Sequence, residues 1–211
     1  MFIGLNVGTQ YLVQKVIHFV MQLFVFLAIP FICYLLTKKK NHGGFLKYIG
    51  LTKASEKSYS SALGITGIAY LFTICYFIVL KFNGGMVISP LQQTYEISSP
   101  ITFAFTSLLF GLNAGVCEEI LFRGFIGKRL IQTLGFKWGN LIQAIIFVFP
   151  HFTTFGITPT FEVIVGVINA GVMGWTFGYI MHKKSKGSIL PSIVVHTLVD
   201  IIAIPISLFL L

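Results

Sequence analysis

Six ionisable side chains stand within apolar stretches of this 211-residue chain, and their types are those of a hydrolytic site. An acid at the centre of a bilayer costs roughly 2.5–3.5 kcal/mol by insertion scales, so such acids usually face an interior cavity and mark a function. Carboxylates and imidazoles are also the side chains that exchange protons with water in catalysis. We therefore expect one polar reaction centre, formed by Glu118, Glu119, Arg123, His151, His196 and Asp200.

Spacing along a helix indicates which of these residues face each other and which role each can have. Glu119 and Arg123 are four positions apart and so face each other on a helix, whereas Glu118 lies about 100° away. We expect Arg123 to pair with Glu119 and to leave Glu118 free to act on water as a general base or acid. His196 and Asp200 have the same four-residue spacing, so this carboxylate could hold one tautomer of the imidazole.

The distances from the expected turns place these residues at a common depth. Gly135 is the expected turn between two spans, and Glu119 and His151 each lie 16 positions from it. At a helical rise of about 1.5 Å per residue, each would stand about 24 Å from the turn. On the same measure His196 and Asp200 lie about 14–20 Å beyond the next turn. All of them can therefore meet at one level.

The elements that must position these residues are membrane spans. The chain is 55% hydrophobic and 10% charged, with a mean hydropathy of +0.88, whereas soluble domains are about 25% charged. We expect an all-α, polytopic transmembrane helix bundle with a polar site inside it, formed by one integral-membrane domain, 1–211. Its six apolar spans lie near 14–36, 61–82, 101–123, 138–154, 161–181 and 189–211.

Basic residues fall in alternate loops between these spans, as the positive-inside rule predicts. They lie in the loops 37–60, 127–137 and 182–188, which we expect in the cytoplasm with both termini outside. The net charge of +9 is thus an orientation signal that could also serve at anionic lipid headgroups. Nothing else in the sequence indicates nucleic-acid binding, and the first apolar run is too long for a signal peptide.

The three cysteines, Cys33, Cys75 and Cys117, lie within spans and form no Cys-x-x-Cys pair. This pattern excludes a disulfide scaffold. Reactive thiols need an electropositive, accessible niche, so Cys117 beside Glu118 is expected to fill space rather than to act as a nucleophile.

Three short motifs, in this order, resemble those of the CAAX-protease and bacteriocin-processing (CPBP, or Abi) family of intramembrane endopeptidases. They read Glu118-Glu119-Ile-Leu-Phe-Arg123, Phe147-Val-Phe-Pro-His151 and His196-Thr-Leu-Val-Asp200, within a protease core of about 100–200. The resemblance implies proteolysis in or beside the bilayer. It implies that Glu118 activates water with help from His151, while His196 and residue 200 stabilise the oxyanion. Since an Asp can donate only when protonated, an ionised Asp200 would orient His196 instead.

The resemblance does not decide whether the hydrolytic water is activated by Glu118 alone or by a bound metal ion. Glu118, His151 and His196 with a water would also form a familiar catalytic zinc set. The chain has no His-Glu-x-x-His motif, and between the two mechanisms we favour a metal-free glutamate mechanism over zinc.

The implied substrate is a peptide or membrane-associated protein, met in the lipid bilayer. The family's bacterial roles are bacteriocin or pheromone processing and self-immunity, and we expect a bacterial plasma membrane. The alternative is a non-enzymatic membrane immunity or scaffold protein, in which the Glu and His residues are structural. A proton-coupled transporter is disfavoured because the chain shows no duplicated halves.

Overall fold

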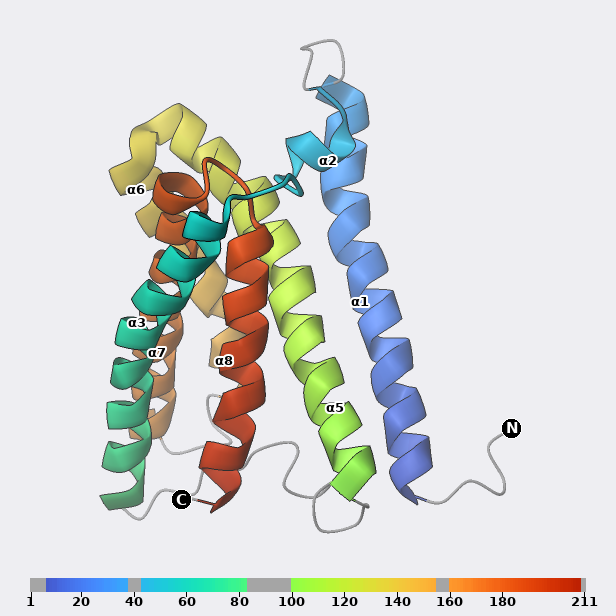
Figure 1. Ribbon diagram of the computed structural model, residues 1–211, viewed down its shortest axis with the longest axis vertical. Coiled ribbons are helices and arrows are strands. Elements are labelled where there is room, and N and C mark those ends of the chain that lie inside the picture. Colours follow the sequence, from blue (N-terminus) through green and yellow to red (C-terminus); the bar gives the residue numbers. More distant parts are fainter. Residues whose placement is uncertain (1–6, 38–42, 83–99, 155–159, 210–211) are drawn as a thin grey trace.

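The computed structural model describes residues 7–37, 43–82, 100–154 and 160–209, and these ranges are helical throughout apart from short turns. The long helices run side by side as one bundle (Figure 1). Four segments are long and apolar enough to span a membrane, and a shorter apolar helix, Leu190–Ile204, completes the set. The predicted polytopic all-α bundle is therefore confirmed, and the chain is an integral membrane protein. Its main helices are α1 (Val7–Thr37), α3 (Glu56–Phe82), α5 (Pro100–Leu112), α6 (Lys128–Val148), α7 (Thr160–Tyr179) and α8 (Leu190–Phe209).

The third and fourth predicted spans are two arms of one helical segment, Pro100–Phe152. The chain turns between the arms at Gly135, whose φ of 74° lies in the left-handed region that glycine adopts without strain. The turn expected at this residue is confirmed. The first arm is longer than expected, because helical structure continues past 123 up to the glycine.

The middle of the first arm is a π-helix, η2 (Asn113–Gly127), which follows α5 directly and continues into α6. A π-helix has i→i+5 hydrogen bonds and a wider turn than an α-helix, and it is usually confined to single turns at functional sites. Two glycines let its neighbours approach closely. A side chain at Gly115 would meet the backbone nitrogen of Thr197 on α8 at 2.8 Å, and one at Gly124 would overlap the carbonyl oxygen of Ile49.

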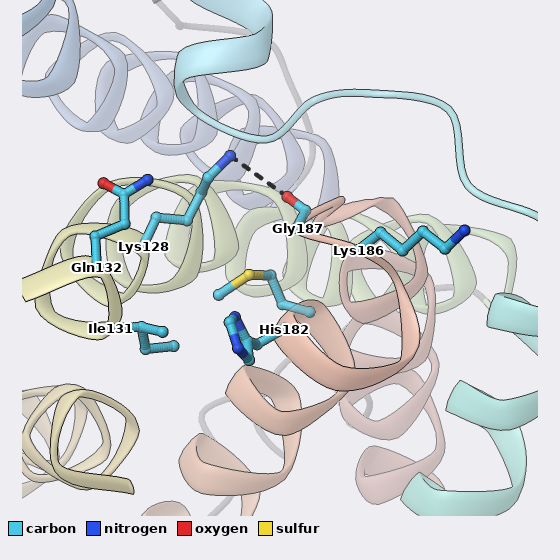
Figure 2. Close-up of a pocket in the computed structure, with 7 residues that line it drawn as sticks. Lys128, Ile131, Gln132, His182, Lys186 and Gly187 are labelled. Carbon is cyan, nitrogen blue, oxygen red and sulfur yellow. Dashed lines mark hydrogen bonds between the residues drawn. The ribbon is translucent and has the colours of Figure 1, made fainter. Parts of the chain in front are cut away.

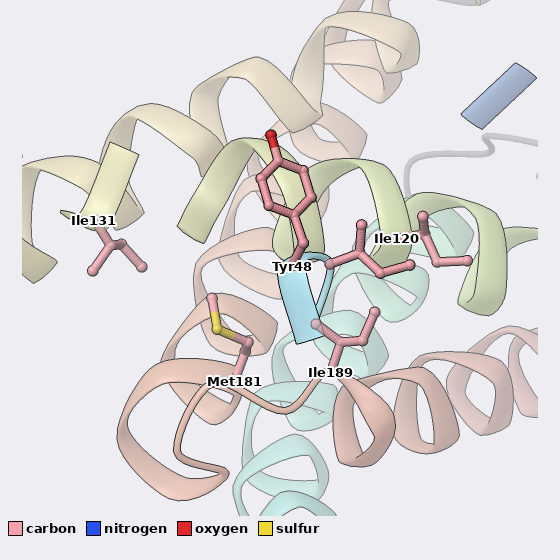
Figure 3. Packing of buried hydrophobic residues seen from close by; sticks show 6 residues of the cluster. Tyr48, Ile120, Ile131, Met181 and Ile189 are labelled. Atoms are coloured by element: carbon pink, nitrogen blue, oxygen red, sulfur yellow. The ribbon is translucent and has the colours of Figure 1, made fainter. Parts of the chain in front are cut away.

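One end of the bundle, called the loop end here, carries α2 (Phe45–Tyr48), the bend at Gly135 and the turn before α8 (Figure 1). Buried apolar side chains from α2, η2, α6, η4 (Ile180–Lys184) and the turn before α8 meet there (Figure 3). They are Tyr48, Ile49, Ile120, Ile131, Met181 and Ile189. This cluster fixes α2 and the turn before α8 against η2, so the position of η2 along the bundle is set by apolar packing at its loop end.

Buried amides join α6 to α7. Asn140 Nδ2 donates to the carbonyl oxygen of Trp175 at 3.0 Å, and Gln143 Nε2 donates to that of Gly174 at 2.8 Å. Gly178 faces Asn140 so closely that a side chain there would overlap the amide. Small residues of α7 thus let α6 approach closely, and these contacts hold α7 beside the arm that carries His151.

Two other polar residues within spans also make interhelical hydrogen bonds. Asn113 Nδ2 donates to Gln22 Oε1 on α1 at 3.0 Å, and Thr73 Oγ1 on α3 donates to Asn169 Oδ1 on α7 at 2.8 Å. Asn113 and Asn169 therefore hold helices together.

Candidate active site

Glu119 and Arg123 form a fully buried ion pair on η2, as the four-residue spacing predicts. Both side chains are 0% exposed, and Arg123 Nη1 lies 2.8 Å from Glu119 Oε1. The N–H is not aligned for a hydrogen bond, and the guanidinium nitrogens have no acceptor among the described residues. Two aromatic faces flank the cation instead, with its Cζ 4.1 Å from the ring centre of Phe147 and 5.2 Å from that of Phe177. Desolvated cation–π contacts of this kind are worth about 2 kcal/mol.

The His196 ring lies between the two adjacent carboxylates. Its Nδ1 is 3.0 Å from Glu119 Oε1, in a buried hydrogen bond, and its Nε2 is 3.9 Å from Glu118 Oε2. Phe177 stacks on the imidazole with ring centres 4.6 Å apart. Glu118 and Glu119 thus lie next to different nitrogens of the same imidazole ring.

Glu118 lies beside His196, as one common polar centre requires, but the expected 100° step from Glu119 does not separate the two carboxylates. That step belongs to an α-helix, whereas η2 is a π-helix. More residues share each turn of a π-helix, so adjacent side chains are separated by a smaller angle. Both carboxylates can therefore reach the same imidazole from neighbouring positions. Exposure still separates them, since the Glu118 side chain is 25% exposed and that of Glu119 is 0% exposed.

Asp200 lies close to His196, as expected, but it does not make the hydrogen bond that orients the ring. Asp200 Oδ2 is 3.6 Å from Nε2, which is beyond hydrogen-bond distance. The orienting bond comes from Glu119, on the other nitrogen. The physical reason is that Arg123 already fixes the Glu119 carboxylate at the ring edge, so the tautomer depends on η2 rather than on the helix that carries His196.

The contacts of His196 indicate where protons must reside. An ionised carboxylate can only accept, so beside Arg123 the Glu119 oxygen takes its hydrogen bond from Nδ1–H. Nε2 then faces the carboxylates of Glu118 and Asp200. Nε2 is therefore the ring nitrogen that remains available to water or a substrate.

His151 lies at the edge of this cluster. It belongs to the 3₁₀ turn η3 (Phe149–Thr154) that follows α6, and its side chain is exposed. Its ring centre is 5.3 Å from that of Phe147, which is itself 6.2 Å from the ring centre of His196. Both imidazoles thus border the same phenyl ring. Within the described ranges no hydrogen bond or ion pair joins His151 to a carboxylate, and its convergence on Glu118 stays a prediction.

A catalytic zinc ion would need Glu118, His151 and His196 to be grouped as its ligands. The hydrogen bond between Nδ1 of His196 and Glu119 leaves Nε2 free, which is an arrangement also found at metal-binding histidines, so the grouping of the donors decides the question. Across the part of the chain that the structure describes, no three His, Cys, Asp or Glu side chains are grouped so as to hold a metal ion. As arranged, Glu118, His151 and His196 do not fit a zinc ion.

Two further residues belong to the site, and one of them carries no signal in the sequence. Phe147 opens the motif that ends at His151, whereas Phe177 is one of 22 phenylalanines, and only packing reveals its contacts with Arg123 and His196.

Cys117 is buried, and its Sγ lies 3.6 Å from Asn113 Oδ1. A buried thiol bonded to an amide has the character of a packing residue.

Comparison with known families supplies the last observation. Residues 98–202 match the model of the family described as Type II CAAX prenyl endopeptidase Rce1-like. Comparisons with curated proteins and with solved structures found no match. The matched segment contains η2, the turn with His151 and the part of α8 with His196 and Asp200. Residues 98–202 of this integral membrane protein therefore belong to the family described as Type II CAAX prenyl endopeptidase Rce1-like.

Proposed function

We propose that the chain is an intramembrane endopeptidase in which Glu118 is the general base. The observation that carries this proposal is the position of His196, held through Nδ1 by the fully buried Glu119 while Nε2 is directed to the partly exposed Glu118. Of the two carboxylates only Glu118 has exposed surface that water and a substrate can reach. A carboxylate and an imidazole side by side supply a base and a hydrogen-bond donor for peptide hydrolysis.

The reaction begins with a water between Glu118 and His196. Their facing atoms are 3.9 Å apart, a separation at which one water can hydrogen-bond to both. Glu118 accepts a proton from this water as the water oxygen adds to the scissile carbonyl carbon. The carbonyl electron pair moves onto oxygen, where a protonated Nε2 of His196 donates to the oxyanion. When the pair returns, the C–N bond breaks and the amine takes the proton from Glu118.

The remaining site residues support these steps. Asp200, at 3.6 Å from Nε2, favours the protonated imidazole that the oxyanion needs. Glu119 and Arg123 act as positioning residues, because they fix the orientation of His196 from a buried position. His151 assists Glu118 in holding the water, from its place beside Phe147. No step uses a metal.

The substrate in this proposal is a peptide or membrane-associated protein presented from the bilayer. Membership of a CAAX-type family supports a substrate whose cleavage site lies next to a membrane anchor. We place the protein in a bacterial plasma membrane, where it would serve bacteriocin or pheromone maturation or self-immunity. The chain's richness in Phe, Ile and Lys supports a low-GC bacterial origin.

The test compares purified wild type with Glu118→Gln, which removes the base and keeps the shape of the side chain. Each is incubated in detergent with a farnesylated CAAX peptide and with its unprenylated counterpart, and products are detected by mass spectrometry. General bases contribute about 10²–10⁴-fold, so Glu118→Gln should lose at least about 100-fold in cleavage rate. Glu56→Gln is the matched control, because Glu56 is an exposed carboxylate at the start of α3.

Two outcomes would count against the proposal. Equal cleavage by wild type and Glu118→Gln would remove Glu118 from the chemistry. A folded wild type that cleaves neither peptide, nor any protein of bacterial membranes supplied with it, would favour the non-enzymatic immunity or scaffold protein.

A further inference from the structure

A second polar pocket lies at the loop end of the bundle, and it involves none of the six site residues. Its volume is about 450 Å³, within the usual range of small-ligand sites. The lining comes from the first turns of α6, from the end of the helix formed by α7 and η4 (Ile180–Lys184), and from the turn that follows. The lining residues are Lys128, Ile131, Gln132, Met181, His182, Lys186 and Gly187 (Figure 2).

The pocket has positive charge and no acid in its lining. Lys128 Nζ contacts only neutral acceptors among the described residues, the carbonyl oxygens of Lys47 at 3.2 Å and Gly187 at 3.5 Å. Lys186 extends outward at the rim (Figure 2). The ion pairs found in the described ranges all involve Arg123 or His196. The cations of this pocket therefore keep their charge available for an anion.

The floor of the pocket is apolar. Ile131 and Met181 line it, and both are buried members of the cluster at the loop end. A free inorganic anion gains nothing from such a floor, whereas an amphiphile can place carbon atoms over it while its charged group meets the lysines. The lining thus combines the two chemistries found in one phospholipid headgroup and its glycerol.

The aromatic residues beside the pocket indicate the depth of the bilayer surface. His182 stacks on Phe136 with ring centres 5.3 Å apart, and Trp175 stacks on Tyr179 at 5.5 Å. Lys183 Nζ lies 4.8 Å from the ring centre of Phe136. Trp and Tyr gather at the headgroup level of membranes, with lysines just outside it. The pocket therefore lies where phospholipid headgroups are.

We propose that this pocket binds the anionic headgroup of a phospholipid, with its phosphate near Lys128 and Lys186 and its glycerol over Ile131 and Met181. Basic pockets between membrane helices on the cytoplasmic side are a known form of anionic-lipid site. The binding does not depend on the proposed peptidase activity. Occupancy would tie α6 to the turn before α8 across the loop end.

The test measures the binding of phosphatidylglycerol to protein purified in dodecylmaltoside, by native mass spectrometry over a lipid titration. The variant is Lys128→Gln with Lys186→Asn. Gln keeps a polar, uncharged side chain at position 128, and Asn tolerates the left-handed φ of 51° at Lys186. The matched control is Lys57→Asn with Lys137→Gln, which removes two exposed lysines of the basic loops that do not line the pocket.

One phosphatidylglycerol should bind to wild type, and the pocket variant should bind it about 25-fold more weakly, since each basic residue near an anionic surface contributes about 1 kcal/mol. The control should stay within about two-fold of wild type. If the control variant lost as much affinity as the pocket variant, binding would be due to diffuse surface charge and the proposal would be wrong. The proposal would also be wrong if wild type bound the zwitterionic lipid phosphatidylcholine as tightly as phosphatidylglycerol. Full competition by inorganic phosphate or glycerol 3-phosphate would instead identify a site for free phosphate. The melting temperature of each variant without lipid shows whether it is folded. If the double variant does not fold, Lys186→Asn alone is used, and we expect it to bind phosphatidylglycerol about five-fold more weakly than wild type.

Discussion

Arg123→Met isolates the energetic role of the buried ion pair. Methionine replaces the apolar stem of arginine without its charge, so Glu119 would lose its cation while the space of the stem stays filled. Both members of the pair are 0% exposed, and Glu119 Oε2 has no hydrogen-bond partner among the described residues. The carboxylate would therefore keep the hydrogen bond from His196 but no charged partner. Leaving one charge of a buried pair uncompensated costs about 3–5 kcal/mol.

The assay is thermal unfolding of the purified protein in detergent. For a chain of this size 1 kcal/mol corresponds to about 2–4 °C, so Arg123→Met should lower the melting temperature by about 6–20 °C. Glu119→Gln combined with Arg123→Met removes the orphaned charge as well, and it should recover most of that loss. It should not recover cleavage, because a neutral amide holds the His196 ring less firmly than a paired carboxylate does. Lys137→Met, at an exposed position, controls for the replacement of a cation by methionine.

The reasoning would be refuted by an Arg123→Met protein with wild-type melting temperature, or by a double variant no more stable than the single one. The first result would mean that the pair contributes nothing to folding. The second would assign the loss to packing against the two phenylalanine rings rather than to charge.

Three further predictions concern the chemistry of the site. Asp200→Asn should keep much of the cleavage rate of wild type, because residue 200 does not orient the ring and an Asn can itself donate a hydrogen bond to the oxyanion; a loss as large as that of Glu118→Gln would contradict this. Replacing Cys33, Cys75 and Cys117 together with alanine should leave a working enzyme, and loss of cleavage in a folded Cys117→Ala variant would restore thiol chemistry to consideration. A chelator should leave cleavage unchanged, whereas stoichiometric zinc by elemental analysis, lost together with activity on chelation, would show that the donor set rearranges around a metal.

The sequence was sufficient for features that depend on local spacing. The pairing of Glu119 with Arg123 follows from four-residue spacing, which places two side chains on one face in either kind of helix. The turn at Gly135 follows from the conformational freedom of glycine between two apolar runs. The spans follow from hydropathy alone.

Features that depend on backbone register or on distant packing could not be predicted. The direction of Glu118 depends on the π-helical form of η2, and no pattern of side chains distinguishes this form from an ordinary helix. The hydrogen bond from His196 to Glu119, and the stacking of Phe177 on the same ring, join residues from three helices. Such contacts are set by how the helices pack, and the identities of single residues do not specify them.

The π-helical register of η2 also limits which changes of chain length the protein can accept. Over Asn113–Gly127 each hydrogen bond spans one residue more than in an α-helix, as if one residue had been inserted per turn. A single deletion here would let a turn relax to α-helical geometry and rotate everything before it relative to everything after it. Glu118 and Glu119 would then no longer address one imidazole, although every side chain of the site were present. We therefore expect deletions and insertions to be excluded between Asn113 and the bend at Gly135.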